Sequence, residues 1–284
     1  MFWNQTTLNC RGQVLDISAP LVMGILNVTS DSFFDGGSYT DRTAFEARIE
    51  EMIREGVDII DVGGMSSRPG SSLISHTEEL KRVLPVIKHL HKVHPETIIS
   101  LDTIHHQVAD ACLAEGAHII NDISAGSIDD KLLSIVAKYK APYVLMHMQG
   151  VPDTMQKQPK YEDVLINVLD FLSARVASLM ELGIIDIIID PGFGFGKTIA
   201  HNYELLANLH VFKILDRPIL CGISRKGMIQ KVLDLPAEKA LNGSTALHMV
   251  ALEQGANILR VHDVHAAVEC VHLFAQVQQA RRAT

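Results

Sequence analysis

Aromatic residues are scarce in this 284-residue chain, at 5%, and tryptophan occurs once. No apolar run approaches the roughly 20 residues that a membrane-spanning helix needs. The start, MFWNQTTLNCRGQ, lacks the basic segment and apolar stretch of a secretory signal. These absences predict a cytoplasmic protein with no membrane partner.

A surplus of basic residues is also lacking. Lys and Arg number 25 against 33 Asp and Glu, which gives a net charge of −8. A general nucleic-acid binder presents a basic face to its ligand, so the composition predicts no nucleic-acid partner. A locally basic pocket for a small anion remains compatible with this balance.

Cysteine is sparse and its spacing carries no metal or redox motif. The four cysteines, Cys10, Cys112, Cys221 and Cys270, are far apart and form no C-x-x-C. We expect reduced thiols in the core of a cytosolic protein. There are 14 histidines but no H-E-x-x-H, so a histidine-based zinc site is not expected.

What the chain does contain is ordinary globular composition, with 47% hydrophobic and 20% charged residues. No low-complexity linker or shift of composition divides it. We therefore predict a single domain over residues 1–284, with a motif-bearing core at about 20–265.

The most distinctive stretch is residues 184–198, IIDIIIDPGFGFGKT. Its isoleucines predict a strand buried on both faces that stops at Asp190, because Pro191 cannot continue a ladder. Three glycines then alternate, at 192, 194 and 196. Their spacing misses both the Walker A loop and the dinucleotide fingerprint by one residue. The remaining interpretations are a backbone that lies against a ligand and a simple glycine-rich turn.

A short apolar run followed by a helical pattern recurs eight times. The expected strands are 21–26, 57–60, 97–101, 117–120, 143–146, 184–189, 218–223 and 256–259. The expected helices are 43–55, 75–90, 107–115, 129–139, 161–182, 201–209, 237–254 and 266–280. The first two helices open with the capping boxes Thr43-x-x-Glu46 and Ser75-x-x-Glu78.

Eight such units in about 260 residues predict an α/β fold, a single (β/α)8 TIM barrel with a short N-terminal extension. A doubly wound open sheet is the alternative. The first twenty residues are expected to form a small lid over the bottom of the barrel.

Active sites of such barrels lie at the C-terminal ends of the strands. Every expected strand ends in a polar residue: Asn27, Asp61, Asp102, Asn121, His147, Asp190, Ser224, Arg260 and His262. Asp122 and Ser224 can also be explained as turn or helix caps. Residues two apart on a strand share a face, so Arg260 and His262 form a cationic pair suited to a diphosphate. The acids and amides opposite suit the donor-acceptor edge of a heterocycle, which makes the expected mouth bipolar.

Taken together, the strand-end motifs resemble those of dihydropteroate synthase, in order over about residues 20–265. The motifs that carry the resemblance are Asn27-Val28-Thr29-x-Asp31-Ser32-Phe33, Ser66-Ser67-Arg68-Pro69-Gly70, Asp102-Thr103, Asn121-Asp122, Met146-His147-Met148-Gln149-Gly150, Asp190-Pro191-Gly192-Phe193-Gly194-Phe195-Gly196-Lys197, Ser224-Arg225-Lys226 and Arg260-Val261-His262-Asp263.

The resemblance implies a homodimeric (β/α)8 enzyme of folate biosynthesis. It would join 4-aminobenzoate to 6-hydroxymethyl-7,8-dihydropterin diphosphate with Mg2+ and release diphosphate. Carried over by motif, the pterin would be held by Asp102, Asn121, Asp190 and Lys226, the diphosphate by Arg260 and His262, and Mg2+ by Asn27. The aminobenzoate pocket would be shaped by Phe33, Ser67, Arg68, Pro69 and Phe195, and Met146 would be a further substrate-binding residue. The catalytic residues would be Arg260, His262, Lys226 and Asp102, without a side-chain nucleophile.

Two residues depart from the family pattern, because Met65 stands where many members have glutamate and Ser67 where they have threonine. A methyltetrahydrofolate methyltransferase would share the barrel and the pterin-reading acids but needs no diphosphate site. A non-catalytic pterin-binding paralogue would keep the acids and lose loop or anion residues. The loop and anion residues are present here, which favours the synthase.

Overall fold

The computed structural model describes residues 6–28, 39–65, 73–150, 155 and 159–282. Eight parallel strands form its central sheet. In chain order they are β3 (Leu21–Asn27), β4 (Ile59–Gly63), β5 (Ile98–Asp102), β6 (Ile119–Asp122), β7 (Tyr143–Met146), β8 (Ile187–Asp190), β9 (Leu220–Cys221) and β10 (Ile258–Val261).

The sheet closes on itself. Its strand order is β8-β7-β6-β5-β4-β3-β10-β9, so each strand lies beside its neighbours in sequence. β10 pairs with β3, which places Arg260 opposite Met23. A parallel bridge between Ile189 and Ile219 joins the two remaining edges. This closure confirms the predicted barrel and is incompatible with an open doubly wound sheet.

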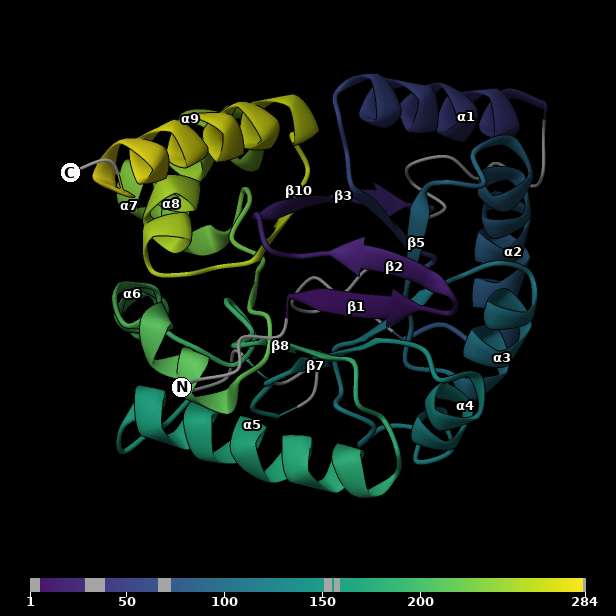
Figure 1. Cartoon of the computed structure of the whole chain (residues 1–284), viewed down its shortest axis with the longest axis horizontal. Coiled ribbons are helices and arrows are strands. Elements are labelled where there is room, and N and C mark those ends of the chain that lie inside the picture. The colour runs from purple at the N-terminus through teal and green to yellow at the C-terminus, as the bar shows by residue number, and fades with distance from the viewer. Residues whose placement is uncertain (1–5, 29–38, 66–72, 151–154, 156–158, 283–284) are drawn as a thin grey trace.

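Helices surround the barrel, as Figure 1 shows. The described ones are α1 (Tyr39–Arg54), α2 (His76–Val93), α3 (His106–Ala114), α4 (Leu132–Tyr139), α5 (Val164–Glu181), α6 (Ile199–Ala207), α7 (Gly227–Leu233), α8 (Leu241–Glu253) and α9 (Val264–Arg282), with the 3-10 helices η1 (Leu209–Leu215) and η2 (Ala237–Lys239). Every helix expected from the sequence has a counterpart, but the one expected over residues 237–254 is divided into η2 and α8, and α7 and η1 are additional.

The start of α2 follows the predicted capping pattern, whereas the starts of α1 and β8 differ from the prediction. The hydroxyl of Ser75 accepts a hydrogen bond from the backbone N of Glu78 at 3.3 Å, so it caps α2 as expected. The capping box at Thr43 is wrong, because α1 begins at Tyr39 and Thr43 lies inside it. The isoleucine-rich strand is shorter than expected and begins at Ile187, since Ile185 is 64% exposed.

The barrel interior follows the two-residue period of its strands. One layer of inward side chains is apolar and consists of Met23, Ile59, Ile98, Ile119, Val144, Ile188, Leu220 and Ile258. Their outward neighbours, such as Ile60, Ile99 and Leu145, pack with residues of the helices in the main core. This apolar layer, called the apolar floor below, lies directly beneath the next inward residues toward the C-terminal ends of the strands.

An N-terminal hairpin covers the bottom of this floor. Its strands are β1 (Thr7–Cys10) and β2 (Gln13–Asp16), joined by Arg11 and Gly12 with φ of 58° and 102°. Such a pair of positive φ values suits the right-handed twist of a two-residue hairpin. Leu8 and Cys10 join the apolar floor, and the hairpin lies across the barrel in Figure 1. The predicted lid is therefore confirmed for the described residues, and ligands must approach from the other end.

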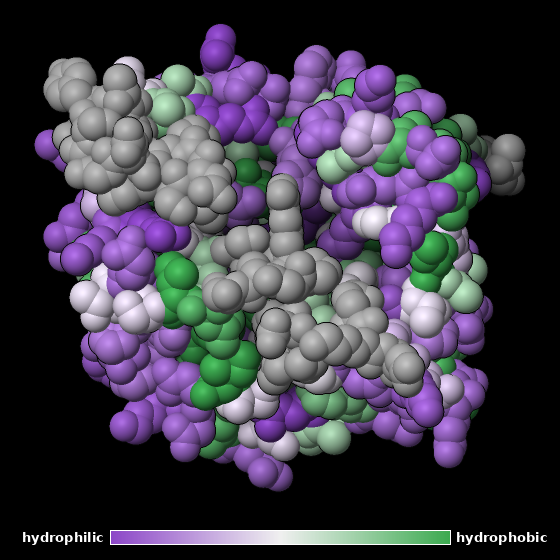
Figure 2. Space-filling model, turned by 180° about the vertical axis from the view of Figure 1, so that it is seen from behind, coloured by the Kyte–Doolittle hydropathy of each residue, from purple (hydrophilic) through white to green (hydrophobic). Residues whose placement is uncertain are grey.

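Figure 2 shows the molecule from the side opposite that view, where hydrophilic side chains make up most of the described surface. The four cysteines are buried and free, as the sequence predicted. Among the described residues, none of the helices combines the length and apolar character needed to cross a bilayer.

Candidate active site

Polar residues occupy the inward layer above the apolar floor. Asp61, Asp102 and Asn121 are buried, with exposures of 0%, 7% and 5%. The sheet register places Asp102 directly opposite Asn121 and Met146 directly opposite Asp190. Adjacent strands are only about 4.8 Å apart, so this register alone brings four predicted substrate-binding residues into two neighbouring pairs.

Arg260 lies among the acids. Its Nε is 2.7 Å from Oδ2 of Asp61, and its Nη2 is 2.7 Å from Oδ2 of Asp102. The same Asp61 oxygen accepts a hydrogen bond from Nδ2 of Asn121 at 3.0 Å. The expected separation of cationic and acidic halves is therefore not found around Arg260. Buried charges without partners are costly, and the long arginine side chain reaches into the barrel to pair with two carboxylates.

Burial shifts the pKa of several of these groups. It raises the pKa of Asp102 to about 7, although the positive charge of Arg260 opposes the shift. It also raises the pKa of Asp190, here opposed first by Lys226. Burial lowers the pKa of Lys226 to about 8 against the attraction of Asp190. The site is thus a poorly solvated place in which charges interact strongly.

The glycine-rich loop after β8 packs tightly against the end of β7. Asp190 Oδ1 accepts a hydrogen bond from the backbone N of Gly192 at 2.7 Å, which fixes the carboxylate at the strand end. Gly192 and Gly196 have φ of 72° and 63°, and a Cβ on either would collide with the carbonyl oxygen of His147 or Gln149. Glycine at these two positions therefore allows the loop after β8 to approach the backbone of His147 and Gln149 closely.

Lys197 fastens the same loop. Its side chain is 3% exposed, and its Nζ lies 2.9 Å from Nδ1 of His147, 2.9 Å from O of Gly192 and 3.1 Å from O of Phe195. Burial lowers the pKa of His147 to about 3, so the ring is neutral and accepts this hydrogen bond. His147 was expected in the polar ring of the mouth, but it is engaged by Lys197 and by the ring of Phe171 at 5.0 Å.

An apolar wall stands at the same end of the barrel. It comprises Met65, Ile104, Ile123, Met146, Met155 and Phe195. Lys226 runs along it, with Nζ 4.6 Å from the centroid of the Phe195 ring and hydrogen-bonded to O of Phe193. The wall brings the predicted ligand residues Met146 and Phe195 together. It also accounts for Met65, which is 6% exposed and contributes apolar surface where the family pattern has an acid.

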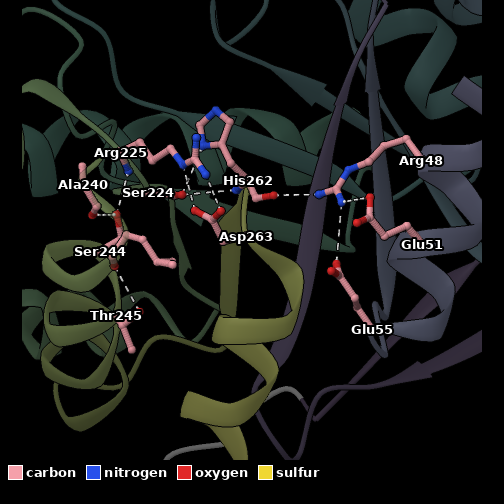
Figure 3. A network of polar contacts seen from close by, with 11 residues as sticks. Arg48, Glu51, Glu55, Ser224, Arg225, Ala240, Ser244, Thr245, His262 and Asp263 are labelled. Atoms are coloured by element: carbon pink, nitrogen blue, oxygen red, sulfur yellow. Dashed lines mark hydrogen bonds and ion pairs between the residues drawn. The ribbon is translucent and has the colours of Figure 1, made fainter. Parts of the chain in front are cut away.

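His262 is held from two sides, as Figure 3 shows. The hydroxyl of Ser224 lies 3.1 Å from its Nδ1 and 3.2 Å from its backbone N. Arg48 of α1 donates from Nη2 to its carbonyl oxygen at 2.8 Å. Ser224 therefore does more than cap a turn. The neighbouring Arg225 is paired through Nε with Asp263 Oδ2 at 2.9 Å.

Asp122 has the structural role that the sequence allowed. It is buried and accepts hydrogen bonds from the backbone N of Ser124 and Gly126, at 2.7 and 2.6 Å. The hydroxyl of Tyr143 adds a third at 2.7 Å. This carboxylate closes the turn after β6 and belongs to the scaffold.

Asn27 ends β3 beside the acids. A Cβ on Gly63 would lie 3.5 Å from Oδ1 of Asn27 and 3.4 Å from Cβ of Asp102, so the glycine keeps the space between them open. No cluster of three His, Cys, Asp or Glu able to hold a metal occurs within the described ranges. Mg2+ commonly takes one or two protein oxygens and completes its shell with phosphate and water. The amide oxygen of Asn27 fits that kind of site.

Four of the predicted ligand residues, Phe33, Ser67, Arg68 and Pro69, lie outside the described residues. The described ones converge at one end of the barrel. Sequence reasoning placed Asp61 in the polar ring without assigning it a role, and it did not foresee the contacts of Lys197 and Arg48. The inward position of Asp61 was predictable, because it follows from the same two-residue strand period as that of the other site acids.

Comparisons with known proteins agree with this geometry. The family model described as pterin binding enzyme matches residues 23–262. Dihydropteroate synthase of Escherichia coli (strain K12) is 44% identical over 276 residues, covering 96% of this chain and 97% of that protein. A Xanthomonas albilineans dihydropteroate synthase structure with 4-aminobenzoic acid superposes with a TM-score of 0.89 at 41% identity, covering 96% of this chain and 98% of that one.

A second Xanthomonas albilineans structure, in complex with 7,8-dihydropteroate, gives a TM-score of 0.86 at 39% identity, with 96% of this chain and 98% of that one covered. The family model spans well over half of the chain, and the relatives match at nearly full length. The chain therefore belongs to the dihydropteroate synthase family of pterin-binding enzymes.

Proposed function

We propose that this chain condenses 6-hydroxymethyl-7,8-dihydropterin diphosphate with 4-aminobenzoate to give 7,8-dihydropteroate and diphosphate. The observation that carries the proposal is the buried network of Asp61, Asp102, Asn121 and Arg260 beside Asp190 at the open end of the barrel. A relative of nearly the same length and fold is seen with 7,8-dihydropteroate, the product of this reaction.

The pterin is recognised by its hydrogen-bonding edge. Asp190 grips the 2-amino group and the neighbouring ring N–H, because its carboxylate is fixed by the backbone N of Gly192. Asp102 and Asn121, opposite each other in the sheet, contact another edge of the ring. Lys226 lies close enough to Asp190 to influence its pKa and completes the polar contacts. Such a site rejects rings that leave its buried groups unpaired.

The diphosphate meets two side chains of the β10 end, one of which, Arg260, also pairs with Asp61 and Asp102 inside the barrel. Arg260 and His262 lie two residues apart at the end of β10 and contact the leaving group. Asn27 would hold Mg2+ through its amide oxygen, and the ion would neutralise charge on the diphosphate. Ser224 orients the His262 ring through the contact between its hydroxyl and the ring Nδ1.

The reaction breaks the bond between the pterin methylene carbon and the diphosphate oxygen, and the bonding electrons leave with the diphosphate. The electron-poor methylene is attacked by the arylamine nitrogen, which then loses a proton. No side-chain nucleophile takes part. Catalysis rests on stabilising the leaving group and on positioning the two substrates, and one well-aimed charged contact contributes about 3 kcal/mol.

The aminobenzoate lies against the apolar wall. Phe195 and Met146 supply its described surface, and Phe195 is 9% exposed. Phe33, Ser67, Arg68 and Pro69 complete the pocket by motif. A Xanthomonas albilineans relative carries 4-aminobenzoic acid, which supports this second substrate.

A homodimer in the cytoplasm completes the proposal. Exposed apolar side chains on α8 and α9, Val250 at 39% and Leu273 at 63%, offer surface for self-association. The four free thiols suit a reducing compartment.

Binding of the pterin substrate to an Asp190→Ala variant tests the assignment. Calorimetry with 6-hydroxymethyl-7,8-dihydropterin diphosphate should show micromolar or tighter binding to the wild type and a loss of at least about a hundredfold in the variant. An Asp163→Ala variant, which removes only the cap of α5, is the matched control and should bind as the wild type does. Equal affinity of Asp190→Ala and wild type would refute the pterin assignment.

A further inference from the structure

Asp61 is a buried carboxylate to which the proposed reaction gives no direct task. It is 0% exposed and lies on β4, opposite Ile25 and Ser100 in the sheet. Asp102 is opposite Gly63, two residues further along β4, so Asp61 lies one layer deeper in the barrel. Its Oδ1 is buried without a partner among the described residues, and its contacts are made by Oδ2.

Asp61 first affects Arg260. The guanidinium donates from Nε to Asp61 and from Nη2 to Asp102, both at 2.7 Å. Two carboxylates that engage different nitrogens of one planar group fix both its position and the tilt of its plane. With Asp61 removed, only the Nη2 contact would remain, and the plane could rotate about it.

Asp61 also fixes the amide of Asn121. Oδ2 of Asp61 accepts a hydrogen bond from the guanidinium of Arg260, so the Asn121 atom that lies 3.0 Å from this oxygen is the amide nitrogen. A flipped amide would place two oxygens against each other. Asn121 therefore keeps its carbonyl oxygen for other partners, and the ring edge that meets this oxygen must carry a donor.

We infer that Asp61 is a positioning residue for pterin recognition, which acts through Asn121 and Arg260. Asp61 fixes the orientation of the Asn121 amide and the plane of the Arg260 guanidinium before the ligand binds. The inference rests on the proposed function, because both of these residues are assigned there to the pterin diphosphate. It adds that the ring is selected for an N–H at the edge that meets Asn121.

A double-mutant cycle on ligand binding tests this action through a neighbour. Calorimetry would measure the Kd of 6-hydroxymethyl-7,8-dihydropterin diphosphate for the wild type, Asp61→Asn, Asn121→Ala and the double variant. Asparagine has nearly the shape of aspartate, but its amide nitrogen can donate a hydrogen bond to Asn121. The amide of Asn121 can then turn by about 180° without losing a hydrogen bond. We expect Asp61→Asn to weaken binding about tenfold or more in the wild type and by a smaller factor in the Asn121→Ala background, where only the action through Arg260 remains.

Asp122→Asn is the matched control. Asp122 is also a buried carboxylate with three hydrogen bonds, but it closes the turn after β6. Chemical denaturation should show that both asparagine variants are folded and less stable, whereas only Asp61→Asn should weaken pterin binding. A merely structural role of Asp61 would make the two variants alike in both measurements.

Three outcomes would overturn the inference. The first is wild-type affinity in Asp61→Asn, and the second is an equal loss of affinity in Asp122→Asn. The third is a penalty for Asp61→Asn that is the same with and without Asn121. Failure of the wild type to bind the pterin diphosphate would refute the proposed function itself, and with it the inference.

Discussion

The hydroxyl of Ser224 lies within 3.2 Å of two nitrogens of His262, the backbone N and the ring Nδ1. Ser224 is 3% exposed, and it joins the end of the β9 segment to the end of β10. The hydroxyl accepts from the backbone N–H and lies against the ring Nδ1, and these two contacts orient the imidazole.

Removing this hydroxyl should impair the reaction of the diphosphate substrate. For Ser224→Ala we expect kcat/KM for 6-hydroxymethyl-7,8-dihydropterin diphosphate to fall about tenfold, which corresponds to about 1.4 kcal/mol for a lost hydrogen bond. Steady-state kinetics at saturating 4-aminobenzoate measure this effect. Ser224→Thr retains the hydroxyl, and its kcat/KM should lie between those of the wild type and Ser224→Ala. A Ser224→Ala enzyme with unchanged kcat/KM would show that the contacts between Ser224 and His262 do not contribute to catalysis.

Lys197 is expected to matter chiefly for stability. Lys197→Met leaves the ring of His147 and the carbonyl oxygens of Gly192 and Phe195 buried without their donor. Unpaired buried acceptors are costly, so urea denaturation should show a loss of about 2–4 kcal/mol in the free energy of unfolding. Lys88→Met is the control, since Lys88 pairs with Glu115 at an exposed site and should change stability by about 0.5 kcal/mol or less. A similar small effect for Lys197→Met would contradict its role in fastening the loop.

His118 makes stability depend on pH. Burial, reinforced by the nearby Arg11, lowers the pKa of His118 to about 4, and its Nδ1 accepts a hydrogen bond from the backbone N of Ile99 at 3.0 Å. An unfolded histidine has a pKa of about 6.5, so the unfolded chain binds more protons between pH 4 and 6.5. The stability of the wild type should therefore fall as pH decreases through this window.

The variant His118→Asn tests this linkage, because its Oδ1 can accept from the same N–H and does not titrate. We expect the advantage of the wild type over the variant in unfolding free energy to shrink between pH 6.5 and pH 4. Denaturation at several pH values gives this difference directly. Parallel stability curves for the two proteins would rule out His118 as the source of the pH dependence.

The barrel and most of its strand-end residues could be predicted because both depend on local pattern. Short apolar runs that end in a polar residue mark the strands, and the two-residue period places Asp61 and Arg260 on inward positions. The hairpin lid was predicted in position, and the Arg11-Gly12 turn explains its form. α7 was missed because its N-cap, Lys226, makes no side-chain capping bond and Gly227 opens the helix.

The contacts that cross the barrel could not be predicted in the same way. Period two gives the face on which Arg260 lies, but not that its side chain extends to two acids on β4 and β5. The glycine spacing after β8 indicated close approach of a backbone, but its partner, the segment at His147 and Gln149, is distant in sequence. Lys197 belongs to the same contact, and a motif does not reveal that buried acceptors of His147, Gly192 and Phe195 surround its Nζ.

Turnover of the purified protein tests the central claim most directly. The protein would be incubated with 6-hydroxymethyl-7,8-dihydropterin diphosphate and 4-aminobenzoate, with and without Mg2+, while 7,8-dihydropteroate and diphosphate are followed. We predict equimolar formation of both products, dependent on Mg2+ and on both substrates. Tight binding of the pterin without any product would contradict the account and identify a non-catalytic pterin-binding protein.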